Sequence, residues 1–174
     1  RKKMDLCSSR TIKDCMMWLA IVDACPDHPF SVVAKQEVKN IQFLKQVFAC
    51  MKAFTIDRDD VRQSMKVIMA VSEEVKNGRN YLIFPEGTRS KNGNQVGEFK
   101  GGSFKAATKA KCPIVPVALI DSFKPFDTKT ISQVDVQVHF LKPMLYEEYK
   151  DMKTVEIAAE VKRRIEEVIK ENER

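Results

Sequence analysis

The chain has 174 residues, a formal net charge of +6 and a pI near 9.0. This length suits one domain spanning residues 1–174, and 44% hydrophobic with 31% charged residues excludes an intrinsically disordered chain. The basic balance favours anionic partners, but lysines and arginines are spread along the sequence without interleaved aromatic residues, which argues against a nucleic-acid module.

Alternating helical and strand patterns run along the whole chain. Apolar residues at helical spacing predict helices over 14–24, 40–51, 60–77, 102–110 and from 154 onward. Extended apolar segments predict strands over 31–35, 53–57, 81–84, 113–119 and 134–140. This order predicts an α/β fold in which helices flank a central, mostly parallel or mixed β-sheet.

Three of these elements carry detailed predictions. The third helix begins at an Asp59/Asp60 N-cap and ends at Asn77-Gly78, with an apolar row made by Val61, Met65, Ile68, Val71 and Val75. The last strand alternates, with Val134, Val136, Val138 and Phe140 on one side and Asp135, Gln137 and His139 on the other. The last helix turns Ala158, Val161, Ile165 and Val168 inward.

The cysteines and the apolar runs argue against disulfide-rich, metal-binding and membrane-spanning proteins. Five cysteines without a CxxC pair predict neither a disulfide framework nor a metal site, and they fit a reducing cytosol. The longest apolar runs, 15–22 and 112–120, are well short of the roughly 20 residues that cross a bilayer. The abrupt RKK start leaves open that an upstream part has been removed.

A turn-forming, charged motif follows the predicted strand 81–84 directly. The motif is FPEGTRS, in which Pro85 stops strand pairing, Gly87 lets the backbone bend, and Arg89 offers a planar fork for phosphate. Glu86 can hold an arginine or a ligand hydroxyl. Ligands collect at the carboxyl ends of strands in α/β sheets, so this motif is a candidate anion site.

Two further segments complete that candidate site. Arg58 ends another predicted strand, and Lys100 lies in GEFKGGSFK, whose glycines precede a helix start. Together Arg58, Arg89 and Lys100 predict a phosphate site. The alternative for each part alone is structural, with FPEG as a tight turn and Arg58 as a salt bridge at a helix start.

These segments resemble the 1-acylglycerol-3-phosphate O-acyltransferases, the lysophosphatidic acid acyltransferases of the PlsC type. FPEGTRS (84–90) resembles the third signature block of that family, and FTIDR (54–58) the second. CPIVPVAL (112–119) resembles the fourth block, while FSVVAKQEV (30–38) and GEFKGGSFKAA (97–107) resemble the segments after the first and third. The resemblance covers roughly residues 26–143.

The resemblance implies an activity and a set of residue roles. Family members transfer a fatty acyl group from acyl-CoA or acyl-carrier protein to the free hydroxyl of lysophosphatidic acid, giving phosphatidic acid. No cofactor or metal is implied, and the protein is expected at the cytoplasmic face of a membrane, peripherally bound. The acceptor's glycerol phosphate is assigned to Arg58, Glu86, Gly87, Thr88 and Arg89, with support from Lys100 and Gly102, and the wall near the acyl donor to Pro116.

The family's catalytic base is missing from its expected position. The family uses a histidine with an aspartate five residues later; here Asp14 matches the aspartate, but Ser9 stands at the histidine position. Neither His28, interpreted as a surface-turn residue, nor His139, interpreted as hydrogen-bonded and structural, has this spacing. Three explanations stay open: a noncatalytic lipid or phosphate binder, an altered start of the chain, or another base.

A lipid substrate also requires a surface that meets the bilayer. Phe43, Phe48 and Met51 beside Lys39, Lys45 and Lys52 form one candidate interfacial patch. The competing interpretation, which the sequence favours, places these apolar side chains in the core.

Overall fold

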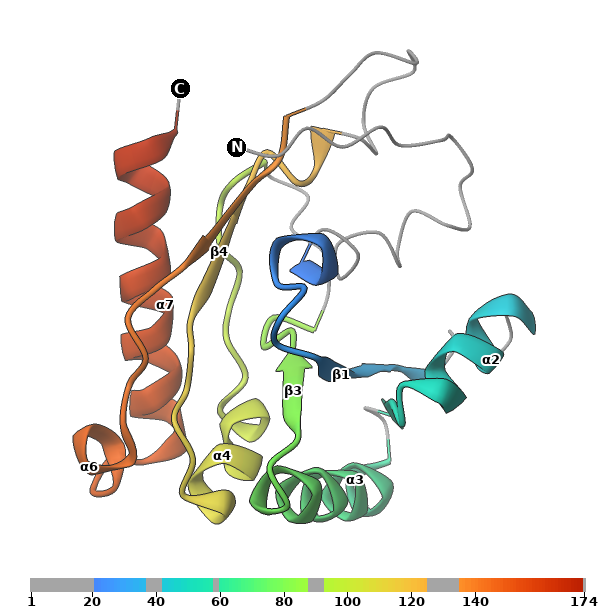
Figure 1. Ribbon diagram of the computed structural model, residues 1–174. Helices are drawn as coiled ribbons and strands as arrows, with labels where there is room; N and C mark the ends of the chain where they lie inside the picture. Colours follow the sequence, from blue (N-terminus) through green and yellow to red (C-terminus); the bar gives the residue numbers. More distant parts are fainter. Residues whose placement is uncertain (1–20, 37–41, 58–59, 88–92, 125–134, 174) are drawn as a thin grey trace.

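The computed structural model describes residues 21–36, 42–57, 60–87, 93–124 and 135–173. Strands and helices alternate along this part of the chain, as the sequence predicts (Figure 1). The strands are β1 (Phe30–Lys35), β2 (Phe54–Ile56), β3 (Asn80–Ile83), β4 (Val117–Ile120) and β5 (Gln137–Phe140). The helices are α2 (Gln42–Cys50), α3 (Val61–Lys76), the 3₁₀ helix η3 (Gly101–Phe104), α4 (Lys105–Ala110), α6 (Tyr146–Tyr149) and α7 (Thr154–Asn172).

The first three strands form a parallel sheet in the order β2-β1-β3. Val32 in β1 is opposite Leu82 in β3, and both side chains pack with Phe48 of α2 on one face. Val33 and Tyr81 lie on the other face, against α3 and α4. The predicted α/β class is confirmed, because helices cover both faces of a parallel sheet.

Helix α3 has the predicted ends, and its apolar row is only partly buried. Asp60 caps the helix by accepting hydrogen bonds from the backbone N–H groups of Arg62 and Gln63, and Gly78 follows the helix with a φ of 86°. Of the predicted apolar row, Val71 is buried, whereas Val61 and Met65 are 75% and 39% exposed. Their place is taken by Val67, which packs with Val71 and Ala106 of α4.

Two residues of the candidate interfacial patch, at the end of α2, belong to the core. Phe48 is buried against Val32, and Met51 packs against the same cluster. The core interpretation is therefore confirmed for these two side chains. Lys39 and the side chain of Phe43 lie outside the described residues.

A second cluster forms where α7 packs against β4 and η3. The inward face of α7 is as predicted at Ala158, Val161 and Ile165, while Val168 is only partly buried. Ile157 and Ile169 join the buried face. In the described part of the chain, no helix is long and apolar enough to span a membrane.

Strands β4 and β5 pair antiparallel, separately from the three-stranded sheet. The predicted alternation of β5 does not produce a buried and an exposed face. Phe140 is 44% exposed, and His139 lies opposite the buried Ala118 of β4. The reason is that α7 packs on β4, and β5 is at the edge of the pair, so both of its faces are only partly covered.

Candidate functional site

The chain reverses direction in a tight turn directly after β3. The N–H of Gly87 donates to the carbonyl of Phe84 at 3.2 Å, which closes a four-residue turn with Pro85 in its second position. Gly87 has a φ of 75°, a left-handed conformation that glycine adopts without steric cost. The tight-turn interpretation of FPEG is confirmed, and it is compatible with a role in binding.

Two hydrogen bonds connect the turn to the segment that leads into η3. A carboxylate oxygen of Glu86 accepts a hydrogen bond from the N–H of Gly97 at 3.0 Å, and the N–H of Lys100 donates to the carbonyl of Pro85 at 3.0 Å. A Cβ atom at position 97 would lie 2.6 Å from that Glu86 oxygen, so only glycine permits the contact unchanged. These two hydrogen bonds hold Gly97 and Lys100 beside the turn.

Burial of Glu86 changes its acidity. The partly buried position raises the pKa of the Glu86 carboxyl, because the charged form loses hydration. The hydrogen bond from Gly97 and the positive charge of Lys162 on α7 oppose that shift only in part. The ionised side chain therefore destabilises the folded state relative to the protonated one.

This pKa shift predicts a pH-dependent effect of Glu86→Gln. A group whose pKa is raised on folding contributes stability that is fully present below its unfolded pKa and is lost as the pH rises through its folded pKa. We expect the free energy of unfolding of the wild type, relative to Glu86→Gln, to be larger at about pH 4 than at about pH 7. Urea denaturation of both proteins at the two pH values measures this; an equal difference would contradict the shift.

Side chains from the first turn of α3 hold the carboxyl end of β2. Ser64 donates its hydroxyl hydrogen to the carbonyl of Asp57 at 2.6 Å. The amide of Gln63 donates to the carbonyl of Thr55 at 2.9 Å and accepts from the N–H of Asp57 at 2.9 Å. These bonds fix the strand end that precedes Arg58. Gln63 and Ser64 were not predicted as positioning residues, although polar residues in the first helical turn after a strand were a visible signal.

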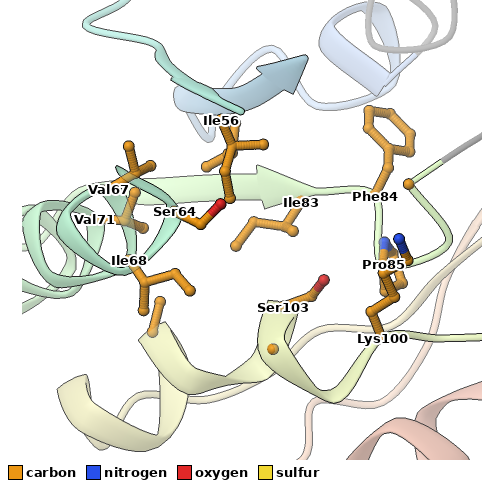
Figure 2. A pocket seen from close by; sticks show the side chains of 14 residues that line it. Ile56, Ser64, Val67, Ile68, Val71, Ile83, Phe84, Pro85, Lys100 and Ser103 are labelled. Carbon is orange, nitrogen blue, oxygen red and sulfur yellow. The ribbon is translucent and has the colours of Figure 1, made fainter. Parts of the chain in front are cut away.

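A pocket of about 220 Å³ lies between the sheet and the α3–α4 layer. Figure 2 shows apolar side chains of α3 and the sheet along most of its wall, with Lys100, Pro85 and Phe84 together at one end. The lining residues come from five segments, β1, β2, α3, the β3 end with its turn, and η3–α4. The apolar part is formed by Val33, Ile56, Val67, Ile68, Val71, Ile83 and Ala106.

The structure brings some of the predicted site residues together. Gly87, Lys100 and Gly102 all line the pocket, with Ser64 and Ser103 as its hydroxyl groups. Lys100 is exposed and, among the described residues, makes no ion pair. The helix start expected near Gly102 is the short 3₁₀ helix η3, whose Gly101 packs closely on Thr154 of α7.

Other predicted site residues are elsewhere or are not described. Pro116 is buried before β4 and does not line this pocket, so its role at the acyl donor stays a prediction. The remaining predicted residues lie outside the described part of the chain: Ser9, Asp14, Arg58, Thr88 and Arg89.

Neither histidine lines this pocket. His28 is exposed in the turn before β1, and its N–H donates to the carbonyl of Cys25. His139 on β5 has its Nε2 atom 3.2 Å from the side-chain oxygen of Gln137. The surface turn expected at His28 and the hydrogen bond expected at His139 are confirmed, and their noncatalytic roles stay predictions. Among residues whose positions are described, no cluster of His, Cys, Asp or Glu side chains forms a metal site.

The layered fold and the pocket beside the FPEG turn define an α/β protein whose mainly apolar pocket has a lysine at one end. A family model described as Acyltransferase matches residues 10–120. The chain therefore belongs to this acyltransferase family. The match includes the pocket-lining segments from β1 to α4, and it ends at the last residue of β4.

Individual relatives agree with the family assignment. The chain is 30% identical over 136 residues to the 1-acyl-sn-glycerol-3-phosphate acyltransferase of Helicobacter pylori, which covers 71% of this chain and 57% of the relative. It is 31% identical over 144 residues to the enzyme of that name from Salmonella typhimurium, covering 82% and 58%. The chain thus spans less than two thirds of the length of these relatives.

A solved structure shows the same fold. The crystal structure of the 1-acyl-sn-glycerophosphate acyltransferase PlsC from Thermotoga maritima aligns with a TM-score of 0.61 and 23% identity. The alignment covers 80% of this chain and 57% of the other. This likeness supports the α/β architecture that the strand order already indicates.

Proposed function

We propose that this chain carries the acyl-transfer site of a lysophosphatidic acid acyltransferase. In the proposed reaction, the free hydroxyl oxygen of 1-acylglycerol-3-phosphate attacks the thioester carbonyl carbon of acyl-CoA or acyl-carrier protein. The new ester bond forms, the carbon–sulfur bond breaks, and the hydroxyl proton leaves with the thiol product. The products are phosphatidic acid and the free thiol of the donor.

One observation carries this proposal: a single pocket combines a long apolar wall with a cationic end. Apolar side chains from α3 and the sheet suit a fatty acyl chain, since they bury hydrocarbon without leaving polar groups unpaired. Lys100 lies with Pro85 at the other end, where a phosphate gains charge-assisted hydrogen bonds from the ammonium group. The names of the relatives, which are acyltransferases acting on 1-acyl-sn-glycerol-3-phosphate, agree with this chemistry.

The proposed roles follow from position. Lys100 binds the acceptor phosphate together with Arg58 and Arg89, which the family resemblance assigns to the same group. Glu86 acts through Gly97, because its carboxylate accepts a hydrogen bond from the backbone N–H of that residue. This bond, with the one between Lys100 and Pro85, keeps the segment that carries Lys100 next to the turn. The polar residues Gln63 and Ser64 position the strand end before Arg58.

Lys100→Gln is expected to raise the KM for lysophosphatidic acid by about 10- to 100-fold. The reason is that a hydrogen bond to a charged group contributes about 1.5–3 kcal/mol, which corresponds to this change in affinity. Thiol release from acyl-CoA, followed at increasing acceptor concentrations, measures the effect.

Lys109→Gln is the matched control for this experiment. Lys109 lies nine residues further along the same segment, is exposed, and does not line the pocket. We expect its KM to stay near the wild-type value. If both substitutions raise KM equally, the cationic end of the pocket is not the phosphate site.

Ser9 at the histidine position favours a second candidate function. Without a positioned base, the pocket is expected to bind lysophosphatidic acid with little turnover, as in a noncatalytic lipid or phosphate binder. The two candidates differ in one assay: thiol release above the uncatalysed rate supports the transferase, whereas lipid binding without release supports the binder.

A further inference from the structure

Helix α3 exposes a row of large apolar side chains to solvent. Val61, Met65 and Met69 are 75%, 39% and 42% exposed, and their spacing of four residues places them along one side of the helix. We call these three residues the α3 stripe. Two of them, Val61 and Met65, belong to the apolar row seen in the sequence, whose spacing alone does not show which members are exposed.

The residues of the α3 stripe are not part of the buried core cluster beneath α3. Val67 and Val71 are buried against α4 and the sheet, and they already provide the packing that holds α3 in place. Exposed valine and methionine side chains make no favourable hydrogen bonds with water. A row of them on one side of a helix therefore marks a surface that meets an apolar partner. Methionine is well suited to such a contact, because its flexible side chain adapts to irregular surroundings.

The charged side chains around the α3 stripe are predominantly cationic. Arg62 and Lys66 are exposed next to it and, among the described residues, have no ion-pair partner. Glu73 is paired with Lys76 at 2.8 Å, which neutralises the acidic group on this side of the helix. Asp60 is occupied as the N-cap. An apolar row flanked by unpaired cations is complementary to a surface with hydrocarbon beneath an anionic layer.

The position of the α3 stripe connects it to the pocket. The same helix contributes Ser64 and Ile68 to the pocket wall, and it begins directly after the carboxyl end of β2. A lipid that passes from a bilayer to the pocket has a short path if α3 itself lies on the bilayer. This geometry favours a lipid surface as the partner over a protein.

We propose that the α3 stripe, with Arg62 and Lys66, is a membrane-docking surface that binds an anionic lipid bilayer. This inference rests on the proposed function, because it supplies the surface from which the lipid substrate enters. In the docked state, the three apolar side chains lie below the headgroups, and the two cations contact lipid phosphates. The surface differs from the α2 patch considered from the sequence, in which Phe48 and Met51 belong to the core.

Vesicle flotation tests this proposal directly. The full chain is mixed with vesicles of phosphatidylcholine alone or of phosphatidylcholine and phosphatidylglycerol in equal parts. For the triple variant Val61→Ser, Met65→Ser, Met69→Ser, we expect the partition coefficient onto the mixed vesicles to fall roughly tenfold or more below that of the wild type. The control Leu145→Ser, Val155→Ser removes apolar side chains that are 55% and 71% exposed elsewhere, and it is expected to bind as the wild type does.

A second variant tests the cationic part of the surface. Arg62→Gln, Lys66→Gln is expected to reduce the preference for mixed over phosphatidylcholine vesicles, with a weaker dependence of binding on salt. The proposal is overturned if the wild type binds neither vesicle, or if the stripe variant binds as well as the wild type. It is also overturned if the control loses as much binding as the stripe variant, or if the stripe variant instead converts a dimer to a monomer.

Failure of the docking proposal can be distinguished from failure of the proposed acyltransferase function. Flotation requires no turnover, so a catalytically silent wild type that binds mixed vesicles through the α3 stripe supports the docking surface alone. Conversely, binding of monomeric lysophosphatidic acid below its micelle concentration reports on the pocket, and the stripe variant is expected to retain it. Circular dichroism of each variant confirms that the fold is kept.

Discussion

Ser9→His is expected to raise the rate of acyl transfer by about 10²- to 10⁴-fold, the range that a positioned general base contributes. The physical reason is that a serine hydroxyl hardly titrates near neutral pH, whereas a neutral imidazole accepts a proton there. Asp14, five residues later, stands at the position from which a carboxylate orients the imidazole. Thiol release with acyl-CoA and lysophosphatidic acid as substrates measures the change.

Two controls make this experiment specific. Ser8→His introduces the same imidazole one residue away, with the wrong spacing to Asp14, and is expected to give no gain. Combining Ser9→His with Asp14→Asn is expected to lose most of the gain, because the imidazole is no longer oriented by a charge. A wild type that turns over as fast as Ser9→His would contradict the prediction and indicate that another group is the base.

Tyr149→Ala is expected to lower the free energy of unfolding by about 3–5 kcal/mol, the range for truncating a large buried aromatic side chain. Tyr149 is 0% exposed, and its ring packs edge-on to Tyr146 at 5.4 Å between centroids. Its hydroxyl donates to the carbonyl of Cys112, and it lies 3.4 Å from that of Ala107. The side chain therefore joins α6 to the end of α4 and the approach to β4.

Tyr149→Phe separates the ring from the hydroxyl. It keeps the packing but removes the donor to Cys112, so a smaller loss of about 1–3 kcal/mol is expected. Burial also raises the pKa of the Tyr149 hydroxyl, so the wild type is expected to lose stability relative to Tyr149→Phe as the pH rises above about 10. Denaturant melts of the three proteins measure these differences; equal midpoints would contradict the account of this core.

The helices were predictable where local signals coincide with periodicity. Asp60 and the Asn77-Gly78 pair marked both ends of α3, because capping depends on residues next to the helix. The buried side of α3 was only partly predictable. Val61 and Met65 share the helical spacing of the row that includes Val71, but they are exposed, and the spacing alone does not show which members of the row are covered.

Strand β5 shows the same dependence on tertiary packing. Its alternation correctly predicted a strand, since period-2 patterning reflects two faces. Which face is buried depends on where α7 lies, and α7 packs on β4 instead. Similarly, the sequence predicted a central sheet, whereas the described strands form a parallel sheet of three and an antiparallel pair.

The candidate site was predictable in its turn and less so in its contacts. Pro85 and Gly87 indicated the turn after β3, because both residues have restricted or special backbone preferences. The bond between Glu86 and Gly97 joins residues eleven positions apart and depends on the fold of the intervening loop. The prediction that Glu86 holds an arginine or ligand hydroxyl did not include this backbone partner.

The most direct test of the central claim compares two ligands on the wild-type chain. Isothermal titration with monomeric lysophosphatidic acid and with the monoacylglycerol of the same chain length separates the phosphate from the acyl chain. We expect lysophosphatidic acid to bind about 10-fold or more tightly, because only its phosphate reaches Lys100 at the end of the pocket. Equal affinities, or no binding of either lipid, would contradict a site that holds an acyl chain and a phosphate together.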